Sequence, residues 1–239
     1  MNKMKYCNPW SETDQTNELQ RIPFDDIVRI ETYNDNVSHE HHKMHDVAHQ
    51  LTPEPFHGDA LNAPIVLLQA NPGFGANDVV DFKRQDWCES MQLNLQLQHE
   101  KMDYPFTPLD PKFSSTTSSG KYWSMILKAL IKESNVESVS KNVAVVELFP
   151  WHSQQFCSGK MFDFLYPSQT TLFNHRLVQL AIDDPDRIVI CCRGSREWKM
   201  VTQRDTAKLI HVRNNRKPYI SPANIGANAW EKLMVKIKN

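Results

Sequence analysis

Polar side chains suited to acid–base and hydrogen-bonding chemistry stand directly after apolar stretches of this sequence. Asn71 follows the apolar run at positions 65–70, and Glu147 stands near the end of the run at 143–148. An amide both donates and accepts hydrogen bonds, whereas an ionised carboxylate only accepts them and a protonated carboxyl group also donates. Burial raises the pKa of a glutamate and so favours its protonated form. These two residues are our first candidates for a site that binds a polar ligand and passes it a proton.

The elements that must position these residues are predicted from the apolar pattern. Apolar runs of this length are typical of buried parallel strands, and helix-like stretches such as 121–133 and 172–182 stand between them. The predicted strands span 65–70, 143–148, 188–192 and 209–212. This alternation predicts an α/β fold with a mostly parallel four-stranded sheet and right-handed crossovers. The turns after parallel strands share one edge, where ligands bind. Here these turns are Asn71, 147–152, 193–196 and 221–226.

Length and composition limit the kinds of protein this can be. The 239 residues suit one α/β domain at 61–239 with an N-terminal arm at 1–60 packed on it. The formal net charge of −1 excludes a wholly basic surface, so a nucleic-acid site must be a local patch. We find neither an apolar run of membrane-spanning length nor a signal-peptide core, and the five cysteines include no CxxC pair. We therefore expect a cytoplasmic monomer with reduced thiols and no membrane partner.

A histidine cluster near the start of the chain is the candidate for a metal site. His41, His45 and His49 have the i, i+4 spacing that can bind zinc in principle. No cysteine or paired acidic ligand accompanies them. We expect an exposed polar helix there, with no metal and no other cofactor.

Two turns of the chain together carry a resemblance to a known family. The segments Gln69-Ala70-Asn71-Pro72-Gly73 and Ser221-Pro222-Ala223-Asn224-Ile225-Gly226 are similar to the paired motifs of the uracil-DNA glycosylase superfamily, nearest its mismatch-specific and single-strand-selective branches. The first motif there reads Gly-x-Asn-Pro-Gly, and this chain departs at the first glycine. The second begins with His or Asn, which this chain lacks. The resemblance covers roughly residues 60–235 and implies a three-layer α/β/α domain around the parallel sheet.

The resemblance implies an enzyme that rotates a base out of DNA and hydrolyses its glycosidic bond. Asn71 then orients the attacking water. In the most uracil-specific branch a tyrosine at the position of Gly73 blocks substituents on carbon 5 of the base, so glycine predicts a pocket that tolerates them. Glycine could equally serve the geometry of the turn. No lysine lies on a motif turn, so we expect no Schiff-base lyase step.

Glu147 is the departure that bears on the substrate, because the single-strand-selective branch has a base-reading Asn there. A carboxylate suits the N4 amine of cytosine, and a protonated carboxyl group could donate to cytosine N3 as the bond breaks. Ser221 supplies part of the stabilisation of the leaving base. Six further residues are expected in the base pocket: Gln69, Ala70, Gly73, Phe74, Phe82 and His152.

A second set of residues is expected to hold the DNA. Ile225 matches the apolar wedge that fills the gap in the duplex, although it could instead pack against the C-terminal helix. Hydroxyl groups and helix-start amides bind phosphates, and arginines add positive charge. These residues are Arg193, Ser195, Arg196, Arg213, Pro222 and Asn224.

The sequence therefore predicts a monofunctional DNA glycosylase that excises a 5-substituted cytosine-type base and leaves an abasic site, in repair or in defence against phage. Three alternatives stay open. They are a uracil or mismatch glycosylase with Glu147 outside the pocket, a non-catalytic nucleic-acid or nucleotide binder that keeps the fold, and a hydrolase of free nucleosides.

Overall fold

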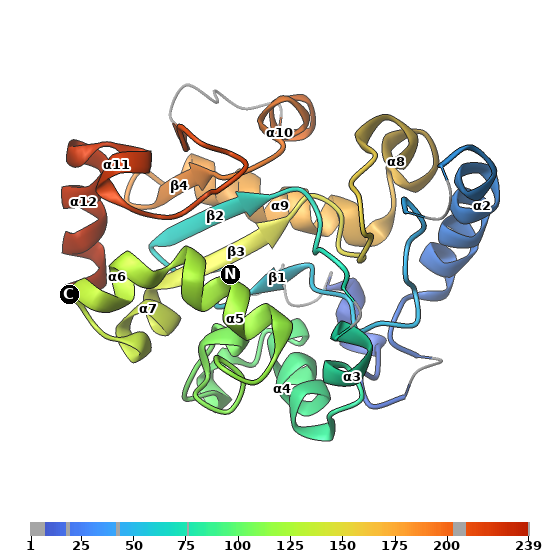
Figure 1. Ribbon diagram of the computed structural model, residues 1–239, viewed down its shortest axis with the longest axis horizontal. Coiled ribbons are helices and arrows are strands. Elements are labelled where there is room, and N and C mark those ends of the chain that lie inside the picture. Colours follow the sequence, from blue (N-terminus) through green and yellow to red (C-terminus); the bar gives the residue numbers. More distant parts are fainter. Residues whose placement is uncertain (1–7, 18–19, 42–43, 76, 203–208, 239) are drawn as a thin grey trace.

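The apolar runs form a central five-stranded sheet in the computed structural model, which describes residues 8–17, 20–41, 44–75, 77–202 and 209–238 (Figure 1). The strand order is β1-β3-β2-β4-β5. Strands β2 (Ile65–Gln69), β3 (Val143–Glu147), β4 (Ile188–Cys191) and β5 (Ile210–His211) run parallel, in the four places that the sequence predicts. Strand β1 (Phe56–His57) pairs antiparallel with β3 and was not predicted, so the sheet is mixed and has five strands instead of four.

Both faces of the sheet are buried because successive strand residues point to opposite sides. Val66 and Leu68 pack into one apolar core, and Ile65 and Leu67 pack into another. The first core is covered by α2 (Phe24–His41), α8 (Ser158–Leu165), α9 (Gln169–Asp183) and α10 (Ser195–Thr202). The second is covered by α5 (Ser118–Ile126), α6 (Lys128–Glu133), α7 (Val136–Asn142) and α12 (Ala227–Lys238). The result is three layers, α/β/α, and it explains why the strands read as continuous apolar runs.

The remaining helices are short and lie mainly in the connections. They are η1 (Pro9–Glu12), α3 (Asp78–Asp81), α4 (Gln85–Leu95), η2 (His99–Lys101), η3 (Thr107–Leu109) and α11 (Pro222–Ile225). The single helix predicted at 121–133 is two helices, α5 and α6, which meet at Leu127. In the described parts of the chain, no helix has the length and apolar character that crossing a membrane requires.

The segment expected as an N-terminal arm belongs to the same core as the sheet. Trp10, Ile30 and Tyr33 are buried in the core that contains Val66, and residues 51–58 are all buried. The segment also supplies β1, which extends the sheet beyond β3. Helix α2 ends at His41, and both His45 and His49 lie in turns, so the predicted helical spacing of the histidines does not continue beyond His41.

Candidate functional site

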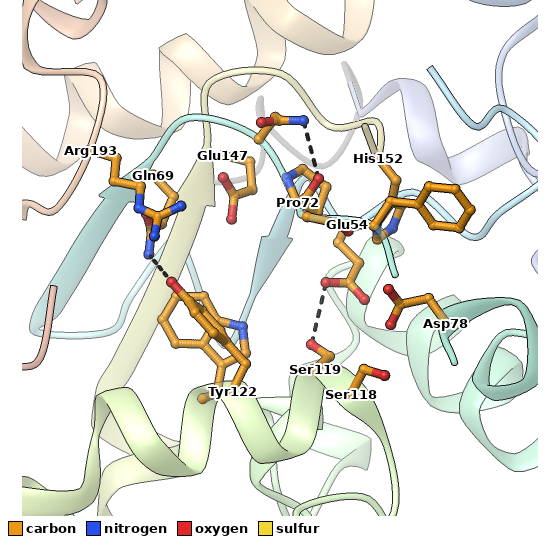
Figure 2. Close-up of a pocket in the computed structure, with 14 residues that line it drawn as sticks. Glu54, Gln69, Pro72, Asp78, Ser118, Ser119, Tyr122, Glu147, His152 and Arg193 are labelled. Carbon is orange, nitrogen blue, oxygen red and sulfur yellow. Dashed lines mark hydrogen bonds between the residues drawn. The ribbon is translucent and has the colours of Figure 1, made fainter. Parts of the chain in front are cut away.

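A cavity of about 270 Å³ lies at the carboxyl ends of β2, β3 and β4, at the edge of the sheet where the sequence places it (Figure 2). The strand ends deliver Gln69, Glu147 and Arg193, and the N-terminal half of α5 forms the opposite wall. Seven residues predicted for the site line the cavity: Gln69, Asn71, Gly73, Phe74, Glu147, His152 and Arg193. Asn71 and Glu147, from two different strands, thus face one space.

Glu147 is a buried carboxyl group without a hydrogen-bond partner among the described residues. It is the last residue of β3 and is 5% exposed. Its backbone is held by Pro55, whose carbonyl accepts from the Glu147 N–H at 2.9 Å, and by the Asn174 amide at 2.9 Å. Within the described part of the chain, no group hydrogen-bonds to its carboxyl oxygens. Burial, reinforced by the charge of Glu54 and only partly offset by Arg193, raises the pKa of Glu147 well above its usual value. The raised pKa favours the protonated form of Glu147, which has one donor and one acceptor.

Glu54 is a second buried carboxyl group in the same cavity, and it was not predicted as a site residue from the sequence. It is 5% exposed and lies two residues before β1. Its Oε2 lies 3.0 Å from His57 Nε2 and accepts from the Ser119 hydroxyl at 3.4 Å, whereas Oε1 is buried without a partner. Burial acts to raise the pKa of Glu54, but the neighbouring His57, the charge of His152 and the Ser119 hydroxyl outweigh it and lower the pKa. Glu54 is therefore the ionised carboxylate of the site.

The two glutamates form a pair whose protonation states differ. Figure 2 shows the carboxyl groups of Glu54 and Glu147 both directed from the sheet toward α5. Their surroundings move the two pKa values in opposite directions. Two carboxyl groups separated in this way can act as an acid and a base in one reaction. Chemically, the cavity can give a proton at Glu147 and take one at Glu54.

Asn71 joins two loops of the cavity wall. Its Nδ2 lies within donating distance of the Pro72 carbonyl (3.1 Å), the Trp151 carbonyl (3.3 Å) and the Ser153 hydroxyl (2.8 Å). No described residue donates a hydrogen bond to its Oδ1. The nitrogen therefore ties the turn after β2 to the loop after β3, and the oxygen is the atom available to a water molecule.

We expect Asn71→Ala to lower the free energy of unfolding by about 1–3 kcal/mol, because it leaves buried acceptors of both loops without their donor. Asn71→Asp should lower it further, since an oxygen then faces three oxygen acceptors. Urea denaturation measures both, with the exposed Asn228→Ala as the matched control. Equal stability of Asn71→Ala and Asn228→Ala would show that the side chain does not hold the loops together.

An amide–phenol pair forms the end of the cavity near Arg193. Gln69 donates from Nε2 to the Tyr122 hydroxyl at 3.2 Å, and the Gln69 carbonyl accepts from the Trp198 indole at 2.8 Å. Burial raises the pKa of Tyr122 to about 12, so the hydroxyl stays protonated and can donate in turn. Tyr122 and Trp123 are aromatic residues that line the cavity; from the sequence they were expected only as part of the helix-like stretch 121–133.

Two residues predicted for the base pocket lie behind its wall. Ala70 is 6% exposed and contributes its carbonyl to the Phe149 N–H, at 3.0 Å. Phe82 is 2% exposed and packs in an aromatic cluster with Trp87, with its ring centroid 4.9 Å from that of His152. Phe82, expected in the base pocket, therefore does not line the cavity, because the core already covers its ring.

His152 joins two walls of the cavity. Its ring is 2% exposed, with Nδ1 at 2.7 Å from the Gly73 carbonyl and Nε2 at 3.0 Å from the Thr52 carbonyl. Both nitrogens are engaged by the protein, so the ring holds the turn of Gly73 against the segment of Thr52 and Glu54. Gly73 itself has room: a Cβ at this position meets nothing within 4 Å, and its φ lies outside the left-handed region. The turn does not require glycine for its geometry.

The second predicted motif does not line this cavity. Asn224 is 8% exposed and its side chain holds a neighbouring loop, accepting from the Asn214 N–H at 2.8 Å and donating to the Tyr219 carbonyl at 2.9 Å. Ile225 is 7% exposed and packs in the core beside α12. The structure therefore shows Ile225 as a packing residue instead of a projecting wedge, and Asn224 as a loop clamp.

The other residues predicted to hold DNA are exposed, and of these only Arg193 lines the cavity. Ser221, predicted to stabilise the leaving base, is half-buried at the start of α11 and does not line the cavity. The remaining exposed residues are Ser195, Arg196, Arg213 and Pro222. Arg193 is the exposed arginine of this set that also lines the cavity.

Comparison with models of protein families, with curated proteins and with solved structures finds no match for this chain. Among the described residues, no group of three or more histidine, cysteine, aspartate or glutamate side chains is arranged to hold a metal ion.

Proposed function

We propose that this protein is a DNA glycosylase that excises a 5-substituted cytosine-type base, in repair or in defence against phage. The observation that carries the proposal is Glu147, a buried and unpartnered carboxyl group directed into a cavity at the ends of three parallel strands. In its protonated form it presents a hydroxyl donor beside a carbonyl acceptor. Cytosine offers the complementary pair on one edge, the N3 acceptor beside the N4 amine donor.

The same carboxyl group supplies what cytosine needs in order to leave. Cytosine is a poor leaving group, and a proton donated to its ring as the glycosidic bond breaks removes the developing negative charge. The raised pKa of Glu147 keeps that proton available above the usual range of a glutamate. The water that replaces the base is assigned to Asn71, whose Oδ1 no described residue occupies. The products are the free base and an abasic site.

The aromatic and open walls of the cavity support a substituted pyrimidine. Phe74, Tyr122 and Trp123 offer rings on which a base can stack. At Gly73 the absence of a side chain leaves open space that the fold does not otherwise require. A group on carbon 5 of the base can pass through this gap.

A uracil or mismatch glycosylase is the second candidate, and the protonation of Glu147 favours it too. A neutral carboxyl group matches the N3–H donor and O4 acceptor of uracil as well as it matches cytosine. The difference lies in the leaving group, because uracil departs as a stable anion and needs no proton. The dependence of the rate on the proton of Glu147 therefore separates the two candidates.

Oligonucleotides that carry one modified position test the proposal. Single- and double-stranded DNAs containing uracil, cytosine, 5-hydroxymethylcytosine or its glucosylated form are incubated with the protein, treated with alkali and resolved on a gel. We expect strand cleavage at a 5-substituted cytosine only after alkali, and release of the free base by chromatography. Intact strands with every DNA would refute the proposal, and cleavage at uracil alone would select the second candidate. Free nucleosides assayed in parallel test the nucleoside-hydrolase alternative.

A further inference from the structure

Hydrolysis of the glycosidic bond releases one proton from the attacking water, and the site must contain a group that accepts it. The attacking water must lose a proton as its oxygen bonds to the sugar, and the Asn71 amide cannot take it. We propose that Glu54, whose side chain lines the cavity, is the catalytic base and that its carboxylate accepts the proton of the water held by Asn71. This inference rests on the proposed glycosylase function, and it assigns a role to a residue outside both motif turns.

The other acidic and basic groups around the cavity are unsuited to this step. Glu147 holds a proton. Asp78 accepts from the Gly75 N–H, and burial raises its pKa, which favours its neutral form. His152 is engaged at both nitrogens by the carbonyls of Gly73 and Thr52. Among the described acidic residues that line the cavity, Glu54 alone has its pKa shifted toward the ionised form.

The fold holds Glu54 rigidly and in its charged form. Its N–H donates to the Pro150 carbonyl at 3.0 Å, and the next residue, Pro55, accepts from the N–H of Glu147 at 2.9 Å. The two glutamates are thus carried by chains hydrogen-bonded to each other. His57 and the Ser119 hydroxyl, at the start of the nine-residue helix α5, hold Oε2. The positive end of that helix favours the negative charge, and Oε1 is buried with no hydrogen-bond partner among the described residues.

The proposed step balances in atoms and charge. The water oxygen bonds to C1′ of the sugar while the bond from C1′ to N1 of the base breaks, and its electron pair passes to the base. Glu147 gives its proton to the base ring at N3, and the water gives a proton to Glu54. The site then holds a neutral Glu54 and an ionised Glu147. Loss of one proton to solvent from Glu54 and uptake of one by Glu147 restore the starting state.

The test is single-turnover excision by Glu54→Gln, which keeps the shape of the side chain and removes its basicity. We expect the rate constant to fall by about 10²- to 10⁴-fold, with DNA affinity and melting temperature close to those of the wild type. The exposed Glu137→Gln is the control and should leave the rate unchanged. Formate added to Glu54→Ala should restore part of the lost rate, because it replaces the missing carboxylate; a purely structural role would show no such rescue.

The wild-type pH profile provides a measurement that needs no variant. The rate should fall at low pH as Glu54 becomes protonated, below the usual pKa of a glutamate, since its pKa is lowered. A profile without this fall, or a Glu54→Gln rate equal to that of the wild type, would overturn the assignment of the base while leaving the glycosylase intact. A wild-type protein that leaves every DNA uncleaved would overturn the proposed function, and this assignment with it.

Discussion

Excision of the cytosine-type base is expected to slow by about 10²- to 10⁴-fold in Glu147→Gln, the range that loss of a general acid typically produces. Glutamine keeps the size of the side chain and still offers a donor and an acceptor, but its amide cannot release a proton to the leaving base. DNA affinity should therefore change much less than the rate. Single-turnover excision and equilibrium binding to the same oligonucleotide separate the two effects.

Uracil serves as the internal control for this variant. If the wild type also removes uracil, Glu147→Gln should leave that rate nearly unchanged, because the uracil anion leaves without a proton. Equal rates of cytosine-type excision in Glu147→Gln and the wild type would remove Glu147 from the chemistry and leave it only a role in recognition.

The same substitution should make the protein more stable at neutral pH. Because the folded-state pKa of Glu147 is raised, the unfolded chain loses its proton near the usual value while the folded chain keeps it. Stability thus falls as pH rises from the usual pKa to the raised one, by about 1.4 kcal/mol per pH unit between them. The free energy of unfolding of Glu147→Gln does not fall in this way, because glutamine does not titrate. Its melting temperature should exceed that of the wild type at pH 7, and the difference should shrink as pH approaches 4.

The second large effect is expected at Gly73. Replacement by tyrosine should strongly reduce excision of a cytosine that carries a bulky group on carbon 5, and should spare a base with a small group or none. The reason is geometric: a Cβ at Gly73 meets no atom within 4 Å, so the fold accepts the ring, which then occupies the rim of the cavity. The ratio of rates on glucosylated and unglucosylated 5-hydroxymethylcytosine measures the effect.

Gly159→Tyr is the matched control for this change. Gly159 is also exposed, a Cβ there also meets nothing within 4 Å, and it lies in α8 away from the cavity lining. Both variants should fold with similar melting temperatures. An unchanged ratio of rates in Gly73→Tyr would mean that the base substituent leaves the site by another route.

The parts of the fold that follow from local sequence were predictable. Strands β2 to β5 are apolar because helices cover both faces of the sheet, and the parallel arrangement brings Asn71 and Glu147 to one edge. Strand β1 was missed because two residues carry no periodicity. It forms because its neighbour β3 offers unpaired backbone groups, which is a property of the folded sheet and is absent from the local sequence.

In the candidate site too, some residues could be predicted from the local sequence and others could not. Residues at strand ends were found because their position in the sequence fixes their position in space. Glu54 gave no comparable signal: the flanking Pro53 and Pro55 indicate only an extended backbone. Its importance arises from His57, Ser119 and Glu147, which reach it from three separate elements. The segment 221–226 was expected at the site because it resembles a glycosylase motif. It does not line the cavity, and Asn224 and Ile225 serve the packing of the fold.

The imidazole of His152 couples the segments that form one side of the cavity. It lies within hydrogen-bonding distance of the Gly73 and Thr52 carbonyls, so it contacts both the turn of Gly73 and the segment that carries Glu54. Its own loop accepts hydrogen bonds from the Asn71 amide. Hydrogen bonds thus connect three stretches of chain that are remote in sequence. A ligand that displaces any of them must shift all three together, so we expect the carboxylate of Glu54 and the amide of Asn71 to keep their relative positions when a ligand binds.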